Sequence, residues 1–249
     1  MYTLKKSLGQ HFLKDENICR KIVESLPVMP GQQILEVGPG AGAITKYLLE
    51  LPDVQFKAVE LDAEKVQYLE NTYPAIRGKL IHESFLETPV PYEGQFSVIG
   101  NFPYNISSQI MFRVLEWKQQ VPVVVGMFQK EVAQRIAATK GKEYGILSVL
   151  IQAYYRVEYL FEVHENCFNP PPKVKSAVIR LHRLEQPYDI ASDRKFLVLV
   201  KTAFNQRRKQ LRNPLKALFD KEYLQDSIFN KRAEELSIAD FAALSHKMI

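Results

Sequence analysis

The fold is decided by one stretch of the sequence, Gln33-Ile34-Leu35-Glu36-Val37-Gly38-Pro39-Gly40-Ala41-Gly42. Its first half is mostly apolar and predicts a buried strand that runs directly into a glycine turn, residues 38–42. Residues 43–51 then predict a helix, which Pro52 ends. A strand that turns straight into a helix exposes backbone amides, and glycines let a ligand approach them closely. The stretch therefore predicts a ligand-binding β-turn-α unit.

Strand and helix patterns alternate on both sides of this unit. We expect helices at residues 16–26, 63–71, 107–117 and 130–139, and strands at residues 33–37, 56–60, 80–82, 96–99 and 121–127. This alternation is typical of an α/β domain with a largely parallel sheet. Residues 144–155 and 175–184 predict two late strands that could form an antiparallel hairpin at the edge.

The strand pattern ends at the polar, proline-containing segment of residues 184–189. Beyond it the patterns are helical, at residues 194–204, 214–218, 233–236 and 238–244. We therefore place a domain boundary near residue 187. The prediction is an α/β domain over residues 1–187, followed by a small C-terminal all-helical domain over residues 188–249.

Composition narrows the class of protein. With 249 residues, 46% of them hydrophobic, the chain can bury a full core, and its net charge of +5 fits a polyanionic partner. Cys19 and Cys167 give no disulfide framework and no metal-ligand cluster, so we expect no metal and a reduced, cytoplasmic setting. No apolar run approaches the roughly 20 residues that span a bilayer. The N-terminus also lacks the apolar core of a secretory signal, so we expect no membrane partner.

Two acidic residues accompany the glycine turn. Glu60 ends the second expected strand, about twenty residues after Gly40, where a carboxylate can accept hydrogen bonds from ribose hydroxyls. Nicotinamide dinucleotides and S-adenosylmethionine (SAM) both offer such a ribose. Glu36, just before the first glycine, would repel a pyrophosphate but attract a cationic amine, which favours SAM. A plain β-turn-α connection without a ligand is the structural alternative.

A second motif, Asn101-Phe102-Pro103-Tyr104, follows the strand at residues 96–99. The Asn101 side-chain oxygen and the Phe102 carbonyl, which Pro103 biases toward an extended conformation, can accept both hydrogens of an adenine amino group. The nitrogen lone pair would then face a methyl donor, and positioning would carry the rate. Tyr104 can stack on the base. The structural alternative is a turn in which Asn101 caps the helix that starts near Ser107.

Five segments together carry a resemblance to a known family. They are KSLGQHFL at residues 6–13, EVGPGAG at 36–42, NFPYNIS at 101–107, QKEVAQR at 129–135 and FNPPPKV at 168–174. In this order, which covers the chain nearly end to end, they resemble the ribosomal RNA adenine N6-dimethyltransferases, and among them the small-subunit dimethyladenosine transferases. The resemblance implies a Rossmann-like, SAM-dependent methyltransferase whose helical C-terminal domain docks on rRNA.

The resemblance also implies a set of cofactor-binding residues. The family's SAM contacts carry over onto His11, Leu13, Gly38, Glu60 and Asn101, and the rest of the expected SAM site consists of Glu36, Gly40 and Gly42. The chain departs from the family after the third strand, where an aspartate usually contacts the adenine amino group of SAM. Ser84 aligns with that aspartate, and either its hydroxyl or the neighbouring Glu83 carboxylate can take the contact.

For the RNA side, the proline loop, residues 168–173, is stiff and can hold Phe168 against the second face of an extruded base, opposite Tyr104. The alternative is a rigid linker with Phe168 in the core. A basic run in the tail predicts a phosphate-tracking surface, with a solvated helix face as the alternative. The expected RNA-binding residues are Lys173, Arg207, Arg208, Lys209 and Arg212, which Lys5, Lys6 and Lys175 could extend.

The resemblance implies one favoured function. We expect a cytoplasmic, monomeric, SAM-dependent enzyme of small-subunit biogenesis that dimethylates two adjacent adenines in the 3′-terminal hairpin loop of 16S rRNA within the 30S particle. One alternative is a large-subunit rRNA adenine methylase that gives antibiotic resistance. Another is a non-catalytic nucleic-acid-binding assembly factor on the same fold. A nicotinamide dehydrogenase would leave the Asn-Phe-Pro-Tyr motif and the basic tail unexplained.

Overall fold

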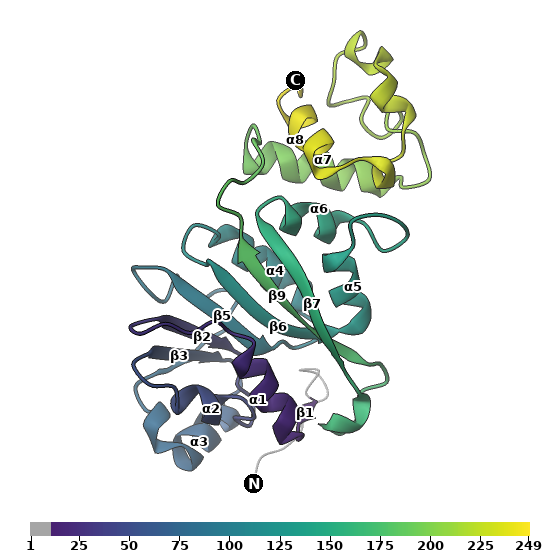
Figure 1. Ribbon diagram of the computed structural model, residues 1–249. Helices are drawn as coiled ribbons and strands as arrows, with labels where there is room; N and C mark the ends of the chain where they lie inside the picture. The colour runs from purple at the N-terminus through teal and green to yellow at the C-terminus, as the bar shows by residue number, and fades with distance from the viewer. Residues whose placement is uncertain (1–10) are drawn as a thin grey trace. The chain divides into compact units, whose positions relative to one another are not determined.

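The structure, a computed structural model, describes residues 11–249. It contains a seven-stranded sheet in the order β4-β3-β2-β5-β6-β9-β7 and a two-stranded sheet of β1 and β8 (Figure 1). The chain divides into two compact units. The first unit comprises the chain up to Ala133 together with Val157–Arg183, and the second comprises Gln134–Arg156 together with Leu184–Ile249.

The strands of the large sheet are β2 (Gln33–Val37), β3 (Gln55–Glu60), β4 (Leu80–His82), β5 (Phe96–Asn101), β6 (Val123–Gln129), β7 (Tyr155–Val163) and β9 (Ser176–Arg183). β2 pairs in parallel with β3 and β5, β3 with β4, and β5 with β6. β9 runs antiparallel to β6, from Val123 opposite His182 to Gln129 opposite Ser176. The predicted α/β class with a largely parallel sheet is confirmed. Because the parallel strands end at one edge, residues that follow them meet there.

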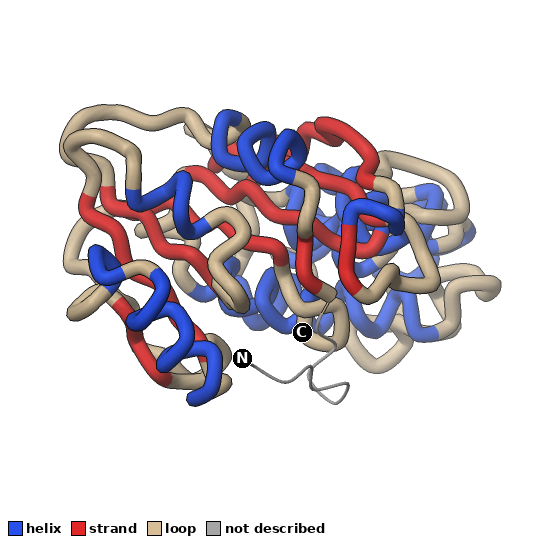
Figure 2. The backbone as a smooth tube through the Cα atoms, turned by 90° about the horizontal axis from the view of Figure 1, so that it is seen from below, coloured by secondary structure: helices blue, strands red, loops and turns tan. Residues whose placement is uncertain are grey.

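The helices are α1 (Glu16–Glu24), α2 (Thr45–Leu49), α3 (Ala63–Thr72), α4 (Ser107–Glu116), α5 (Lys130–Ala137), α6 (Ile146–Gln152), α7 (Asp193–Asn205) and α8 (Ile238–Ser245). Figure 2 shows helices on both sides of the strands. The strands at the centre of the sheet are accordingly buried: in β2 and β5 every residue except the terminal Gln33 and Asn101 is buried.

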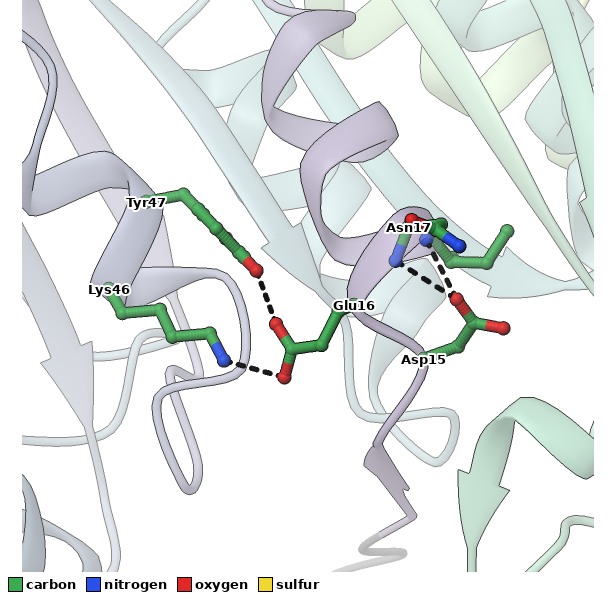
Figure 3. A network of polar contacts seen from close by, with 6 residues as sticks. Asp15, Glu16, Asn17, Lys46 and Tyr47 are labelled. Atoms are coloured by element: carbon green, nitrogen blue, oxygen red, sulfur yellow. Dashed lines mark hydrogen bonds and ion pairs between the residues drawn. The ribbon is translucent and has the colours of Figure 1, made fainter.

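The start of α1 is fixed by two acidic residues (Figure 3). The Asp15 carboxylate caps the helix by accepting hydrogen bonds from the amides of Asn17 and Ile18, at 3.0 and 3.1 Å. The Glu16 carboxylate accepts hydrogen bonds from the Lys46 ammonium at 2.6 Å and from the Tyr47 hydroxyl. Since Lys46 and Tyr47 belong to α2, these contacts join α1 to the helix that follows the glycine turn.

The segment predicted as a strand at residues 144–155 is mostly helical instead. Its centre forms α6, and the Gly145 amide donates to the Ser148 hydroxyl at 2.9 Å at the helix start. The prediction failed because a short, continuously apolar run, ILSVLIQ, has no period that separates a buried strand from a buried helix.

The domain boundary differs from the prediction in the same region. The second unit has two segments: Leu184–Ile249, which starts close to the predicted boundary near residue 187, and Gln134–Arg156, which the sequence pattern assigned to the first domain. This unit is helical, as predicted for α7 and α8. Residues 214–218, however, form turns, and residues 233–236 form only the 3-10 turn η6 (Ala233–Glu235).

Two short strands, β1 (Phe12–Leu13) and β8 (Phe168–Asn169), had no counterpart in the sequence patterns. They pair antiparallel, with Phe12 opposite Asn169 and Leu13 opposite Phe168. Each strand has two residues, which is too short to show a period of two. The pairing joins the segment before α1 to the proline loop.

The glycine turn is fixed by the elements around it. The Gly38 amide donates to the Val59 carbonyl of β3 at 2.9 Å. Gly42 has a φ of +83°, and a Cβ added there would lie 2.4 Å from the ring of Tyr73, the residue that ends α3. Gly42 is therefore required both by backbone conformation and by the close approach of α3.

We predict that Gly42→Ala lowers the free energy of unfolding by roughly 1–3 kcal/mol for the left-handed backbone, and by a further amount for displacing Tyr73. Urea unfolding measures the loss. Gly78→Ala is the matched control, because Gly78 has a similar φ of +75° but nothing within 4 Å of the added Cβ. An equal loss in both variants would contradict the role given to the Tyr73 contact.

Candidate active site

One pocket of the first unit lies where β2, β3 and β5 end. It is lined by residues 11–13, 36–41, 43–44, 59–61, 83–86 and 101–106. The structure thus brings together the segment before α1, the glycine turn, the ends of β3 and β4, and the Asn-Phe-Pro-Tyr motif. Pockets at this edge of an open parallel sheet are the usual ligand sites of such folds.

Most of the predicted site residues line this pocket. They are His11, Leu13, Glu36, Gly38, Gly40, Glu60, Glu83, Ser84, Asn101, Phe102 and Tyr104. Gly42 and Phe168 are not among the lining residues. Gly42 instead packs against Tyr73, as described above, so its contribution is to the shape of the turn.

Glu60 is oriented by backbone amides. Its two carboxylate oxygens accept hydrogen bonds from the amides of Gly40, at 3.0 Å, and Asp62, at 2.9 Å. The side chain is buried, and burial raises the pKa of its carboxyl while these two hydrogen bonds oppose the shift. The bond to Gly40 also closes the glycine turn against β3. Glu60 therefore has a fixed direction at the pocket wall, as a ribose-binding carboxylate requires.

Glu36 is the least satisfied group of the site. Its side chain is 0% exposed, and neither carboxylate oxygen accepts a hydrogen bond from the described part of the chain. The pKa of this carboxyl is raised to about 8, chiefly by burial; the nearby Thr45 hydroxyl lowers it and the charge of Glu60 raises it. A buried carboxyl without a partner at a pocket wall suits a cationic ligand group that would supply the missing charge.

The Phe102 backbone is anchored from both sides. Its amide donates to the Met127 carbonyl of β6 at 3.2 Å, and its side chain is 1% exposed. The ring fills a slot above two glycines, since a Cβ on Gly126 would lie 2.4 Å from it and one on Gly100 2.7 Å. The predicted function of Phe102 lies in its carbonyl, and the structure adds that its ring holds that carbonyl in place.

Asn101 and Tyr104 both contact the segment before α1. The Asn101 amide nitrogen lies 3.5 Å from the His11 carbonyl, to which it donates, so that the amide presents its oxygen as an acceptor. The Tyr104 ring is stacked with the His11 ring, with centroids 5.8 Å apart. Residues far apart in the sequence therefore form one wall of the pocket.

Phe168 is not placed where the sequence interpretation put it. Its side chain is 0% exposed and packs in the core cluster with Leu13, its partner in the β1–β8 pair. Strand alternation explains the difference, because it turns Phe168 inward and leaves Asn169 exposed. The alternative interpretation, a rigid linker with Phe168 in the core of the protein, describes its position in this structure. The proline loop reaches the pocket wall through Pro170, whose carbonyl lies 2.9 Å from Nδ1 of His11.

Ser84 and Glu83 both remain at the pocket. The Glu83 amide donates to the Glu60 carbonyl at 3.1 Å. The Ser84 carbonyl accepts from the Glu87 amide at 2.9 Å and from the Thr88 hydroxyl at 2.8 Å, so it begins a turn after β4. The structure thus holds both residues at the position where the family usually has its aspartate, and either side chain can serve an adenine amino group.

The basic run of the second unit, residues 207–212, contains arginines that bond within the protein and basic residues that are exposed. Arg207 donates to Glu234 at 2.5 Å and to the Gly141 carbonyl at 2.9 Å, while Arg212 donates to the Asn230 side chain. These two arginines hold the loop together. Arg208 and Lys209 are exposed, as is Lys173 in the first unit. Lys5 and Lys6, which could extend the basic face, lie outside the described residues.

Arg208 and Lys209 also line a second, polar pocket, which lies within the second unit. Its other lining residues are Gln210, Asn213, Asn230, Arg232, Glu234 and Glu235. Arg232 was not predicted from the sequence. An isolated bridge between Gln210 and Arg232 brings it beside the basic run, and no local pattern announces that pairing.

Residues 11–249 offer neither a metal cluster nor a membrane span. No cluster of three or more His, Cys, Asp or Glu side chains in this range could hold a metal ion. In the same part of the chain no helix is long and apolar enough to cross a membrane.

The sheet order, the glycine turn and the acidic ends of β2 and β3 define a Rossmann-like methyltransferase fold of the SAM-dependent class. The family model described as ribosomal RNA adenine dimethylase matches residues 1–248. The chain belongs to this family. It is accordingly an rRNA adenine dimethyltransferase with SAM as its methyl donor, and the resemblance carried by the five segments is confirmed.

Individual relatives agree with the family. The chain is 53% identical to the ribosomal RNA small subunit methyltransferase A of Flavobacterium johnsoniae, over 98% of this chain and 95% of the relative. It is 50% identical to the protein of the same name from Phocaeicola vulgatus, over 98% of this chain and 89% of the relative.

Solved structures share the fold. A dimethyladenosine transferase from Plasmodium falciparum superposes with a TM-score of 0.78 at 23% identity, over 93% of this chain and 94% of the other. The 23S rRNA methyltransferase ErmE superposes with a TM-score of 0.74 at 21% identity, over 95% of this chain and 99% of the other. At these identities the likeness concerns the fold alone.

The unpartnered Glu36 generates a prediction about pH. Between the ordinary carboxyl value of 4.5 and about 8, the folded protein keeps a proton on Glu36 that the unfolded chain has lost. Stability without SAM therefore falls as the pH rises through this range. In Glu36→Gln the free energy of unfolding should decrease less steeply with pH, by up to about 1.4 kcal/mol per pH unit. Glu60 contributes in the same direction, so part of the slope should remain.

Urea unfolding at a series of pH values checks this prediction. Glu83→Gln is the control, because it neutralises an exposed carboxylate of the same pocket. An equal change of slope in both variants would contradict the role given to the burial of Glu36. An unchanged slope in Glu36→Gln would show that Glu36 is already ionised in the folded protein.

Proposed function

We propose that the protein dimethylates N6 of two adjacent adenines in the 3′-terminal hairpin loop of small-subunit (16S) rRNA. We further propose that it acts as a cytoplasmic monomer on the 30S particle, as a step in small-subunit biogenesis. One observation carries the proposal: the Asn-Phe-Pro-Tyr motif and the glycine turn line the same pocket. An amine acceptor site and a methyl-donor site must share one cavity for direct transfer.

In the proposed mechanism, residues around the pocket hold the two reactants. SAM supplies an electrophilic methyl group on a cationic sulfur. Glu36 would face the cationic amino group of SAM, Glu60 its ribose, and Ser84 or Glu83 its adenine. The Gly38 and Gly40 backbone allows close approach, as their positive φ values require glycine. Water exclusion by β1 would strengthen each of these electrostatic contacts.

The adenine amine is a poor nucleophile because its lone pair is delocalised into the ring. In the first transfer, acceptance of its two hydrogens by the Asn101 side-chain oxygen and the Phe102 carbonyl would favour a pyramidal nitrogen, with the lone pair toward the methyl group. In the second transfer the methylated amine keeps one hydrogen, which one of these two acceptors would take. After transfer the amine is cationic and acidic, so it can release its proton to water without a strong base. Orientation, supported by the buried Phe102 ring, would carry most of the rate.

The names of the 53% and 50% identical relatives support the small subunit as the substrate. The large-subunit alternative rests on a fold likeness at 21% identity, which carries no substrate information. The assembly-factor alternative would require the acceptor site to be inactive, whereas Asn101 and Tyr104 are present and line the pocket.

Labelled SAM and unmethylated small subunits test the proposal, with dimethyladenosine as the product measured. In Asn101→Ala we expect a loss of roughly 100-fold or more in turnover, by analogy with the removal of one transition-state hydrogen bond. In Tyr104→Ala we expect roughly 5- to 150-fold lower kcat/KM for the subunit, the equivalent of one lost base stack.

Gln109→Ala, an exposed position of α4 outside the pocket, is the control and should retain activity. Transfer to large subunits instead of small ones would favour the first alternative. SAM binding without any transfer would favour the assembly factor.

A further prediction concerns the basic run. We propose that Arg208 and Lys209 contact RNA phosphates, whereas Arg207 and Arg212 hold the loop. The double variant Arg208→Ala with Lys209→Ala should weaken binding and reduce the slope of log affinity against log salt concentration by about 2. Lys221→Ala removes an exposed charge elsewhere on the same unit and should leave the slope unchanged. A slope equal to that of the wild type in the double variant would contradict the assignment.

A further inference from the structure

The side chain of Tyr104 is held at two points by residues outside the Asn-Phe-Pro-Tyr motif. Its hydroxyl lies 2.5 Å from the Oγ of Ser176, and its ring is stacked with His11. The three residues come from the end of β5, the start of β9 and the segment before β1. Their meeting at one ring is a product of the fold, and no sequence pattern indicates it.

Ser176 is a rigid partner. It is 0% exposed and is the first residue of β9, directly after the proline loop. It pairs with Gln129 of β6, and the neighbouring Lys175 carbonyl accepts a hydrogen bond from the Lys130 amide at 2.9 Å. A serine with its backbone fixed in a sheet and its side chain buried places its hydroxyl within a narrow range.

His11 supports the same ring from another direction. Its Nδ1 lies 2.9 Å from the Pro170 carbonyl of the proline loop, which fixes the imidazole beside Tyr104. Because Ser176 follows that loop and Pro170 lies within it, both supports of Tyr104 are joined to one stiff segment of the chain.

The hydrogen bond to Ser176 and the stacking with His11 limit the rotation of the Tyr104 ring, which must stay in one plane to stack on a base. A tyrosine side chain turns about two torsions, and a hydrogen bond at the far end of the ring limits both. Most of a stacking contribution of roughly 1–3 kcal/mol depends on the ring lying parallel to the base at the correct height. Burial raises the pKa of Tyr104, so its phenol stays neutral and keeps its hydrogen-bonding proton.

We propose that Ser176 is a positioning residue for the target adenine, which it serves by holding the plane of the Tyr104 ring through the hydrogen bond between their hydroxyls. The proposal rests on the proposed function, because it requires Tyr104 to stack on the base. Ser176 does not itself line the pocket, so its effect passes through Tyr104.

A double-mutant cycle tests this inference in the full-length protein, with unmethylated small subunits and SAM as substrates. Ser176→Ala and Tyr104→Phe each remove the same hydrogen bond from opposite sides. We expect each variant to lower kcat/KM for the subunit roughly 3- to 10-fold, and the double variant to lower it no further than one single variant does. KM for SAM should stay unchanged in all three, and Ser176→Thr, which keeps a hydroxyl, should restore activity.

Ser97→Ala is the matched control for stability. Ser97 is likewise buried in the sheet, on β5, and its hydroxyl accepts a hydrogen bond from Gln32 at 2.7 Å, outside the pocket. If Ser176→Ala lowers the free energy of unfolding as Ser97→Ala does but leaves kcat/KM unchanged, the role of Ser176 is structural and the proposal fails. If the losses of kcat/KM in the two single variants multiply in the double variant, the proposal is overturned as well.

The outcomes separate this inference from the proposed function. If the wild-type protein forms no dimethyladenosine on small subunits, the proposed function itself fails. If Tyr104→Ala methylates as well as the wild type does, the stacking role of Tyr104 is wrong, and the role of Ser176 falls with it while the proposed function stands. If Tyr104→Ala is impaired while Tyr104→Phe is fully active, only the role of Ser176 is overturned. Tyr104→Phe leaves β9 intact, so this comparison decides the matter even if Ser176→Ala does not fold.

Discussion

The hydrogen bond from the Gly40 amide to the Glu60 carboxylate is the contact on which the rest of the site depends. It fixes the glycine turn against the end of β3, and the Asp62 amide fixes the same carboxylate from the other side. A shift of the turn would move Glu36 and Gly38 away from the acceptor motif at the end of β5. This wall of the pocket therefore owes its shape to a carboxylate that two backbone amides hold in place.

Two acidic side chains are buried close together at this site, which is electrostatically unfavourable in the empty protein. Glu36 is buried without a hydrogen-bond partner, which is the main reason that its pKa is raised. The nearby charge of Glu60 acts in the same direction. Such an arrangement lowers the stability of the empty protein, and a cationic ligand would relieve it. The apolar interior of β2 and β5 supplies the stability that this arrangement needs.

Local patterns in the sequence were sufficient for the parallel strands, because apolar residues dominate β2, β5 and β6, and a helix follows each of β2, β3 and β5. They were also sufficient for the pocket, since residues after parallel strands must meet at one edge. They failed at α6, where an apolar run fits a buried strand and a buried helix equally well. They also failed at Phe168, where a two-residue pairing with β1 turned the ring into the core, and at Ser176 and Arg232, whose partners are distant in the chain.

The β1–β8 pair also has a consequence for how the protein is made. Residues 11–13 form one wall of the pocket, yet their partner strand is Phe168–Asn169. During synthesis residues 11–13 emerge long before β8, so they cannot pair with it until the proline loop has left the ribosome. The glycine turn and its neighbouring strands can assemble earlier from local segments. The pocket of the first unit is thus completed only after the proline loop has been synthesised. In a nascent chain truncated before that loop, residues 11–13 would lack their partner strand and this wall of the pocket would be missing.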